Sequence, residues 1–569
     1  MPSHILKENS SDSARLWWRE AAIYQVYPRS FKDSNGDGEG DLLGVISKLD
    51  YIKSLGVDAI WLSPFYTSPN KDGGYDVSNP RDVDRRFGSI SDAEALIESA
   101  HKYGLRIIVD IVPNHFSTEH VWFQEALKSP PGSTARARFH FYDGRGVNGD
   151  IPPNNWCSIF GGSAWTRIKE IDGKPGQWYL HLFDSSQADL NWENNEVKRD
   201  FEKTLRFWLD KGVDGFRIDV AHGLVKDKIL QDHRDPEGLT RALRLDVSDM
   251  PRDERELLLS DVPFFDREGV HEIYRNWRRI FDSYSGQRMS VAEAWVHPSS
   301  RATRYVREDE LHQIFNFDFL IAEWDASFLK SAIDRTLHEV SAVGAPATWV
   351  LCNHDSPRLV TRLGGGELGS KKARAMALLT HALPGGIYIF QGEELGLEDG
   401  SIPDHRRQDP VYFRTHGADK GRDGARVPIP WSAGLPHYGF TSGEPWLPMP
   451  EGWDALAVNS QNSAESYLEL YKKSLAMRRK LFTLNGSEGK TDQRLQKISW
   501  IDSPRGVLAF RRGEHFILYS NTTGQHLDLT LEESANDFTI ALSSSPGARA
   551  DGGLLHLPDH TTVWLAGPR

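Results

Sequence analysis

Apolar residues recur at helical spacing along most of this 569-residue chain, and a short, almost wholly apolar segment follows each such stretch. We expect the first helix between Asp41, which would cap it, and Gly56, which would end it. Its apolar face is predicted to consist of Leu43, Ile46, Leu49, Ile52 and Leu55. A second helix is expected from Asp92 to Gly104, and a third covers residues 194–211.

The apolar segments between these helices are predicted to be buried strands. They lie at residues 57–65, 105–115, 213–221, 288–295, 314–319, 348–356 and 386–394. Alternating helices and apolar strands are typical of a parallel sheet covered by helices, an α/β fold. At this chain length we expect eight such strands, one more than these seven, and this favours a closed (β/α)8 TIM barrel over the alternative, an open doubly wound sheet.

Two regions interrupt the alternation. Residues 116–187 are rich in Gly, Pro, Asn and aromatic residues, and we expect them to form a loop-rich insert after the third strand. From about residue 491 the pattern alternates, as in VLAFRRGEHFILYS and HLDLTL, which predicts a C-terminal antiparallel β-sandwich domain. The expected parts are a barrel from residues 1–115 and 188–490, an inserted subdomain of residues 116–187 and an all-β domain of residues 491–569.

The charge balance narrows the class of partner. Eighty acidic against 67 basic residues give a net charge of −13, which disfavours a nucleic acid or an anionic membrane as partner. The chain has no apolar run long enough for a membrane helix and no apolar segment typical of a signal peptide. Two cysteines cannot form a disulfide framework at this size. We therefore expect a cytoplasmic protein, either a monomer or a homodimer.

Several predicted strands end in acidic or imidazole side chains, which are His115, Asp219, Glu293, His354 and Asp355. The carboxyl ends of barrel strands meet at one rim, so the three carboxylates are expected to share a site. Arg217 lies two residues before Asp219, on the same side of the strand, where it would favour the ionised carboxylate. One such residue alone is typical of an ion pair or a loop cap. Their repetition at the ends of four strands favours glycoside hydrolysis, which uses two carboxyl groups of different proton affinity.

Four segments resemble signatures of the α-amylase superfamily, glycoside hydrolase family 13. They are DIVPNH at 110–115, GFRIDVAHG at 215–223, VAEAW at 291–295 and LCNHDSPR at 351–358. Residues 25–64 and GGYDV at 73–77 also resemble its oligo-1,6-glucosidase and α-glucosidase branch, including actinobacterial-type α-glucosidases. The resemblance implies that Asp219 is the nucleophile, that Glu293 is the general acid and base, and that Asp355 stabilises the transition state. It also implies retention of the anomeric configuration.

The same resemblance implies a set of groups around the terminal glucose. They are Asp72, Tyr75, His115, Arg217, His354 and Arg422. Phe160 and Gln187, from the insert, are expected to line the entrance. Asp76 is expected to hold Arg217 or Arg422 in place. GRDGARVPIPW at 421–431 resembles the GRDG segment of the α-glucosidase branch, which favours removal of single terminal glucose units over cleavage inside long polymers.

We therefore expect an exo-acting retaining α-glucosidase that acts on short α-glucosides such as maltose, isomaltose or sucrose, with some transglucosylation. The alternative is a dedicated transglucosylase or an isomerase similar to sucrose isomerase or trehalose synthase, because the glucosyl-enzyme step is shared. Val220 is a residue type associated with α-1,6 bonds, but residues 405–413 differ from the oligo-1,6-glucosidase pattern, so the linkage stays open. The non-catalytic ectodomain of amino-acid transporter heavy chains is disfavoured, because all three carboxylates are present.

DSNGDGEGD at 33–41 places Asp33, Asn35, Asp37 and Asp41 among glycines, a pattern of oxygen ligands that suits a hard cation. It is not an EF-hand, because Gly44 occupies the twelfth position, where an EF-hand has Glu. The family resemblance implies one structural Ca²⁺ or Mg²⁺, with the main-chain carbonyl of Glu39 completing the set. No other cofactor is expected.

Overall fold

A computed structural model describes residues 16–243, 250–260, 262–482, 497–532, 535 and 537–568. Its centre is an eight-stranded parallel sheet. The strands are β1 (Ala22–Val26), β2 (Ala59–Leu62), β5 (Arg106–Ile111), β11 (Gly215–Ile218), β12 (Met289–Ala292), β13 (Gln313–Ile314), β14 (Thr348–Val350) and β15 (Gly386–Phe390).

Strand pairing closes this sheet into a barrel except at one seam. The order is β13-β12-β11-β5-β2-β1-β15-β14, so the seam lies between β13 and β14. The Thr348 hydroxyl donates a hydrogen bond to the Ile314 carbonyl and so bridges the seam. The (β/α)8 TIM barrel expected from the sequence is confirmed.

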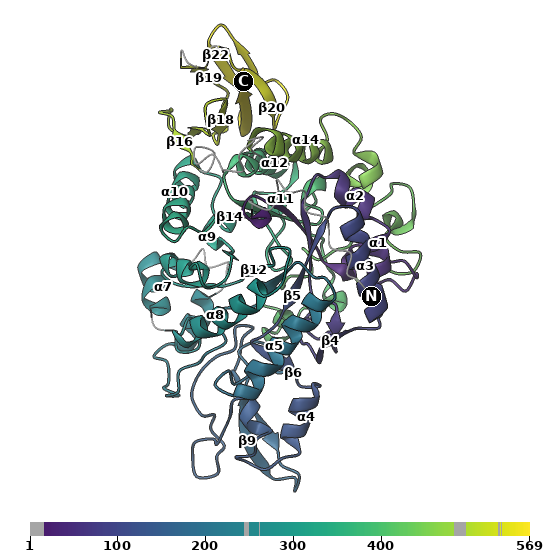
Figure 1. The fold of residues 1–569 in the computed structure, drawn as a ribbon, viewed down its shortest axis with the longest axis vertical. Helices are drawn as coiled ribbons and strands as arrows, with labels where there is room; N and C mark the ends of the chain where they lie inside the picture. Colours follow the sequence, from purple (N-terminus) through teal and green to yellow (C-terminus); the bar gives the residue numbers. More distant parts are fainter. Residues whose placement is uncertain are drawn as a thin grey trace.

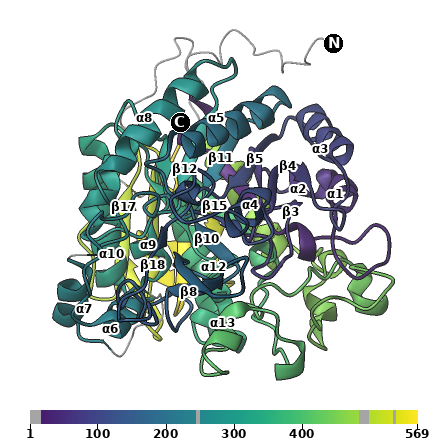
Figure 2. The same cartoon turned by 90° about the horizontal axis from the view of Figure 1, so that it is seen from below.

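Helices surround the barrel strands (Figure 2). The longer ones are α3 (Ile90–Lys102), α5 (Asn195–Asp210), α8 (Gly269–Asp282), α10 (Ala326–Ala342), α12 (Gly366–Ala382) and α14 (Tyr467–Phe482). The shorter ones are α1 (Leu42–Ile46), α2 (Leu49–Ser54), α6 (Pro236–Ala242), α7 (Arg252–Leu259), α9 (Phe317–Leu320), α11 (Leu359–Arg362) and α13 (Pro410–Arg414). No helix within the described ranges is long and apolar enough to cross a membrane.

The first predicted helix is two helices, α1 and α2, and its apolar face is shifted. The helix breaks after Ile46. Leu43 faces outward, with 48% of the residue exposed, and Leu42 and Val45 form the buried face of α1 instead. Asp41 caps α1 as expected, by accepting a hydrogen bond from the Gly44 N–H.

Two further expectations differ from the structure, and one strand was not predicted. Ser89, not Asp92, caps α3, and Asp92 completes a capping box as the third helical residue. The segment 314–319 is a strand only to Ile314, because α9 begins at Phe317. Strand β1 was not predicted from the sequence, because no helical stretch precedes it and Gln25 interrupts its apolar pattern.

The insert after β5 begins and ends as a two-stranded antiparallel ribbon. Its strands are β6 (His115–Ser117) and β10 (Gln187–Asp189), which pair so that Gln187 lies opposite Ser117 and Asp189 opposite His115. Between them lie α4 (Val121–Leu127), β7 (Phe141–Tyr142), β8 (Trp165–Lys169) and β9 (Pro175–Leu180). The ribbon therefore brings His115 and Gln187 together at the rim of the barrel.

The C-terminal strands form two antiparallel sheets at the opposite end of the molecule from the insert (Figure 1). One contains β16 (Ser499–Trp500), β17 (Val507–Arg511), β18 (Phe516–Asn521), β23 (Thr561–Ala566) and β20 (Thr539–Ser543). The other contains β19 (Leu527–Thr530), β22 (Leu554–Leu557) and β21 (Arg549–Asp551). β17 and β18 form the predicted hairpin. The boundary expected near residue 491 lies outside the described residues.

One more strand pair matters for the site. β3 (Tyr66–Thr67) and β4 (Asn79–Val83) pair antiparallel, and the loop between them carries Asp72 and Tyr75. The loop is held over the carboxyl end of the barrel because the Tyr66 hydroxyl donates to the main-chain carbonyl of Asp110, on β5.

Candidate active site

The centre of the site is the buried guanidinium of Arg217, on β11. Its Nη1 lies 2.7 Å from Oδ1 of Asp110 and 2.6 Å from Oδ1 of Asp219, and its Nη2 lies 3.7 Å from Oε2 of Glu293. The barrel register produces the first contact, since Arg217 pairs directly with Asp110 of β5. A buried charge is strongly unfavourable unless it is paired, so these carboxylates and this guanidinium stabilise one another.

Asp110 is a member of this cluster that was not predicted from the sequence. It is fully buried, and it accepts hydrogen bonds from Nε1 of Trp61 at 2.9 Å and from the Tyr75 hydroxyl at 3.3 Å. Burial raises the pKa of Asp110 to about 6, against the effect of Arg217. The available signal was a lone carboxylate in the apolar segment IIVDIV, where an unpaired acid would be costly.

Asp219 and Glu293 compete for one proton. Burial raises the pKa of Asp219, Arg217 lowers it, and the neighbouring charge of Glu293 raises it again, so that the pKa stays above its ordinary value. Burial also raises the pKa of Glu293. Arg217 is about 1 Å closer to Asp219 than to Glu293, so it favours the negative charge on Asp219 and the proton on Glu293.

The residue that follows Asp219 has an unusual backbone conformation. Val220 has φ of +43°, a left-handed conformation that β-branched residues rarely adopt. In that conformation its N–H donates a 2.7 Å hydrogen bond to Oε2 of Glu293. The residue after Asp219 therefore fixes the position of Glu293.

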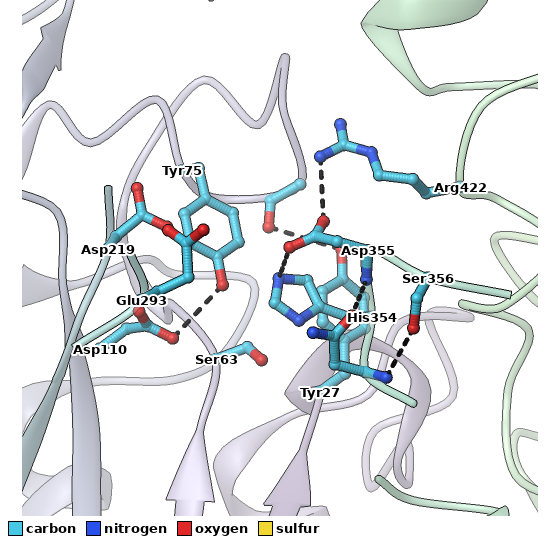
Figure 3. Close-up of polar contacts among 12 residues, drawn as sticks. Tyr27, Ser63, Tyr75, Asp110, Asp219, Glu293, His354, Asp355, Ser356 and Arg422 are labelled. Carbon is cyan, nitrogen blue, oxygen red and sulfur yellow. Dashed lines mark hydrogen bonds and ion pairs between the residues drawn. The ribbon is translucent and has the colours of Figure 1, made fainter. Parts of the chain in front are cut away.

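Asp355 has a different environment, in which cations dominate. Its Oδ1 accepts a hydrogen bond from Arg422 at 3.0 Å, and its Oδ2 lies 3.1 Å from Nε2 of His354 (Figure 3). The same Oδ1 also accepts a hydrogen bond from Arg426 at 2.8 Å. Burial alone would raise the pKa of Asp355, but these neighbours outweigh it and hold the pKa well below its ordinary range. Asp355 is therefore ionised at neutral pH.

Gln25, on β1, holds the His354 ring in place. The Gln25 amide nitrogen lies 2.8 Å from Nδ1 of His354, and an amide N–H can only donate, so the imidazole proton is assigned to Nε2, which faces Asp355. Tyr75 stacks on the ring, with centroids 5.2 Å apart and an interplanar angle of 5°. Burial lowers the pKa of His354 to about 3, so the ring is neutral at pH 7.

Arg422 joins three carboxylates. Its Nη2 lies 2.6 Å from Asp72, its Nε lies 2.6 Å from Asp409, and its Nη1 reaches Asp355. Its guanidinium carbon lies 5.1 Å from the ring centroid of Phe160, which places this insert residue against the site.

Gln187 connects the insert ribbon to the same group. Its amide donates a 2.9 Å hydrogen bond to Asp72 and lies 3.1 Å from Nε2 of His115. Contacts thus link the entire predicted catalytic and glucose-binding set: Asp72, Tyr75, His115, Phe160, Gln187, Arg217, Asp219, Glu293, His354, Asp355 and Arg422.

The carboxylates are not equally accessible. The exposed fraction of the side chain is 9% for Asp219, 13% for Glu293 and 32% for Asp355. Water and ligands therefore reach the cluster most easily at Asp355, and Asp219 lies deepest.

One sequence expectation is wrong, and two residues besides Asp110 and Gln25 were missed. Asp76 contacts neither Arg217 nor Arg422; its carboxylate accepts hydrogen bonds from the backbone of Lys71 and Asp72 and from the Ser68 hydroxyl, and so shapes their loop. Asp409 performs the role assigned to Asp76, and Arg426 pairs with Asp355. Arg426 belongs to the quoted segment 421–431, four residues after Arg422, so its charge was visible there.

The loop 33–41 lies apart from these carboxylates. The carboxylate of Asp33 accepts N–H groups of Asn35, Gly36 and Gly38, while Asn35 and Asp37 each accept an N–H two residues on. Burial would raise the pKa of Asp33, but hydrogen bonds from Thr441 and the loop backbone lower it below its ordinary value. The Glu39 side chain is paired with Arg29 at 2.6 Å through Oε1, and the ligand that the family resemblance implies is its main-chain carbonyl. This oxygen-rich donor set fits a hard cation.

Comparisons with known proteins find similar sequences and similar structures. The sequence profile described as "Alpha amylase, catalytic domain" matches residues 25–486. An oligo-1,6-glucosidase from Parageobacillus thermoglucosidasius is 36% identical over 507 residues, which cover 82% of this chain and 84% of the relative. A trehalose-6-phosphate hydrolase from Bacillus subtilis (strain 168) is 34% identical, covering 91% and 92%. The crystal structure of XgtA, an alpha-glucosyl transfer enzyme, superposes with a TM-score of 0.85 at 36% identity, covering 97% and 100%.

Asp409 provides a test of how Arg422 is held. Burial disfavours the ionised form of Asp409, but Arg422 outweighs burial and lowers the pKa of Asp409 to about 2. The ionised Asp409 therefore stabilises the folded protein fully above about pH 4, and this stabilisation is lost as the pH falls from about 4 to about 2. We predict that Asp409→Asn lowers the free energy of unfolding at pH 7 by about 2 kcal/mol and lowers kcat/KM by about tenfold or more. Chemical denaturation and steady-state kinetics measure the two effects.

The matched control is Asp404→Asn, in the same loop, because the Asp404 carboxylate is exposed in its pairs with Arg407 and Lys420. It should change both quantities little. Equal effects of the two substitutions would contradict the role given to Asp409.

Proposed function

Because the chain belongs to the α-amylase catalytic-domain family and is a glycoside hydrolase, we propose that it is an exo-acting retaining α-glucosidase for short α-glucosides. The observation that carries this proposal is the pair Asp219 and Glu293, divided electrostatically by Arg217. A deep ionised carboxylate beside a protonated one provides a nucleophile and a general acid at neutral pH.

In the proposed reaction, the Asp219 carboxylate attacks the anomeric carbon of the terminal glucose. Glu293 gives its proton to the departing glycosidic oxygen, and a covalent glucosyl-enzyme forms. Glu293, now a carboxylate, then takes a proton from water, whose oxygen displaces Asp219. Two inversions at one carbon retain its configuration.

Asp355 and its neighbours supply recognition of the sugar. An ionised carboxylate beside a neutral His354 offers an acceptor and an N–H donor to vicinal hydroxyls. The Asp72–Arg422–Asp355 ion pairs form a continuous barrier of charged side chains next to Asp355. This barrier supports exo action, because a further glucose unit on the non-reducing side would have to break these ion pairs to bind at that point.

The acceptor decides between hydrolysis and transfer. The glucosyl-enzyme reacts with water in a hydrolase and with a second sugar in a transglucosylase or isomerase. Similarity to an oligo-1,6-glucosidase favours hydrolysis, whereas similarity to XgtA keeps transfer as the second candidate. Similarity to a trehalose-6-phosphate hydrolase adds a phosphorylated disaccharide to the substrates to be tested.

A product panel tests the proposal. We predict that maltose, isomaltose or sucrose at low concentration gives glucose as the main early product, first as the α-anomer by NMR, and that maltodextrins lose single terminal units. The panel also includes trehalose and trehalose 6-phosphate.

Three results would contradict the proposal in separate ways. Early β-glucose would exclude retention, internal cleavage of maltodextrins would exclude exo action, and new disaccharides without free glucose would establish the transfer alternative.

We also propose that the loop 33–41 holds one structural Ca²⁺ or Mg²⁺. Its ligands would be Asp33, Asn35, Asp37 and Asp41 together with the Glu39 carbonyl, and the ion would tie the loop together without entering the reaction. The loop is tied to a distant part of the chain by the hydrogen bond from the Thr441 hydroxyl to Asp33, so the ion would stabilise that contact.

We predict that a chelator lowers the melting temperature, that added Ca²⁺ restores it, and that Asp37→Asn abolishes this response. Binding to the folded state alone stabilises it by mass action. Asp50→Asn, which removes an exposed carboxylate from α2, is the control and should respond like the wild type. A melting temperature that is insensitive to chelator and Ca²⁺ would remove the metal proposal.

A further inference from the structure

Two histidines and an aspartate gather on one face of the smaller C-terminal sheet. β19 and β22 pair antiparallel with Asp528 directly opposite His556, and His526 precedes Asp528 by two residues. Residues two apart along an extended chain share a face, and directly opposed residues on paired strands do too. The backbone therefore fixes all three side chains on the same side.

The nitrogen atoms of both rings approach one carboxylate oxygen. Nε2 of His526 lies 3.1 Å, and Nδ1 of His556 lies 2.6 Å, from Oδ1 of Asp528. The two rings are nearly parallel, with centroids 6.2 Å apart and an interplanar angle of 26°. Among the described residues, this is the one group of three His, Cys, Asp or Glu whose ligand atoms all lie within 4.8 Å of one another.

We propose that His526, Asp528 and His556 form a surface site for a transition-metal dication, with Zn²⁺ as the best match. Two imidazole nitrogens and one carboxylate oxygen are a common Zn²⁺ ligand set, and a fourth, open position is filled by water. Nitrogen ligands disfavour Ca²⁺ and Mg²⁺, which prefer oxygen, so this site and the loop 33–41 select different metals.

The spacing needs little change to accept the ion. Tetrahedral ligands at about 2.1 Å from Zn²⁺ are separated by about 3.4 Å. The His526–Asp528 distance is already near this value, and the His556–Asp528 distance can widen by a small rotation of the exposed Asp528 side chain.

The site would act on the β domain and not on the reaction. β19 and β22 are labelled at the end of the molecule opposite the insert (Figure 1). A metal ion bound by residues of both strands would fasten the strand pair, and its effect would be on stability.

The test is isothermal titration of the full-length, tag-free protein with ZnCl₂ in the presence of excess Ca²⁺. We expect His556→Ala and His526→Ala each to lose one equivalent of bound Zn²⁺ or to bind it roughly tenfold more weakly or worse. The matched control is His338→Ala, an exposed histidine of α10, which should bind Zn²⁺ like the wild type. Far-UV circular dichroism without metal establishes that each variant folds.

A second readout separates the metal from a general effect of the histidines. Zn²⁺ should raise the melting temperature of the wild type and of His338→Ala but not that of His556→Ala. Unchanged Zn²⁺ stoichiometry and affinity in both cluster variants, or an equal loss in His338→Ala, would overturn the proposal.

Discussion

The guanidinium of Arg217 holds three carboxyl groups that could not otherwise share the interior of a barrel. Its contacts of 2.6 and 2.7 Å go to Asp219 and Asp110, with Glu293 further away at 3.7 Å. One positive charge cannot neutralise three negative charges, so burial forces the cluster to retain a proton. Because Arg217 lies closer to Asp219 than to Glu293, the negative charge is favoured on Asp219 and the proton on Glu293. This difference distinguishes the proposed nucleophile from the proposed acid.

A second, more cationic group lies beside the first. Arg422 and Arg426 both contact Oδ1 of Asp355, which keeps this carboxylate ionised while Asp219 and Glu293 share a proton. Arg422 is in turn held by Asp72 and Asp409, which come from segments far apart in the sequence. The barrel therefore presents carboxylates of two kinds, and the difference arises from the number of cations around each.

The barrel and the carboxylates at its rim could be predicted from the sequence because both follow from strand direction. Parallel strands place their carboxyl ends together, whatever the intervening loops do, and this is sufficient to bring Asp219, Glu293 and Asp355 together. Asp110 and Gln25 were not predicted because they lie within strands. Their partners depend on the register between neighbouring strands, and a single sequence does not contain that register.

The carboxylate partner of Arg422 could not be predicted correctly, because it lies in an irregular loop. The sequence pointed to Asp76 because it is next to the glucose-binding segment, but Asp76 binds the backbone of its own loop. Asp409 reaches Arg422 because the chain folds back between residues 409 and 422, where the two residues contact through main chain and side chain. Irregular loops have no periodicity from which such a path could be predicted.

The division of charge by Arg217 is tested most directly by trapping the covalent intermediate. The protein would be incubated with 5-fluoro-α-D-glucosyl fluoride, a slow donor, and digested with pepsin for mass spectrometry. We predict one added 5-fluoroglucosyl group, carried by Asp219. A label on Glu293 or Asp355, or turnover of the donor without any labelled peptide under rapid acid quenching, would contradict it.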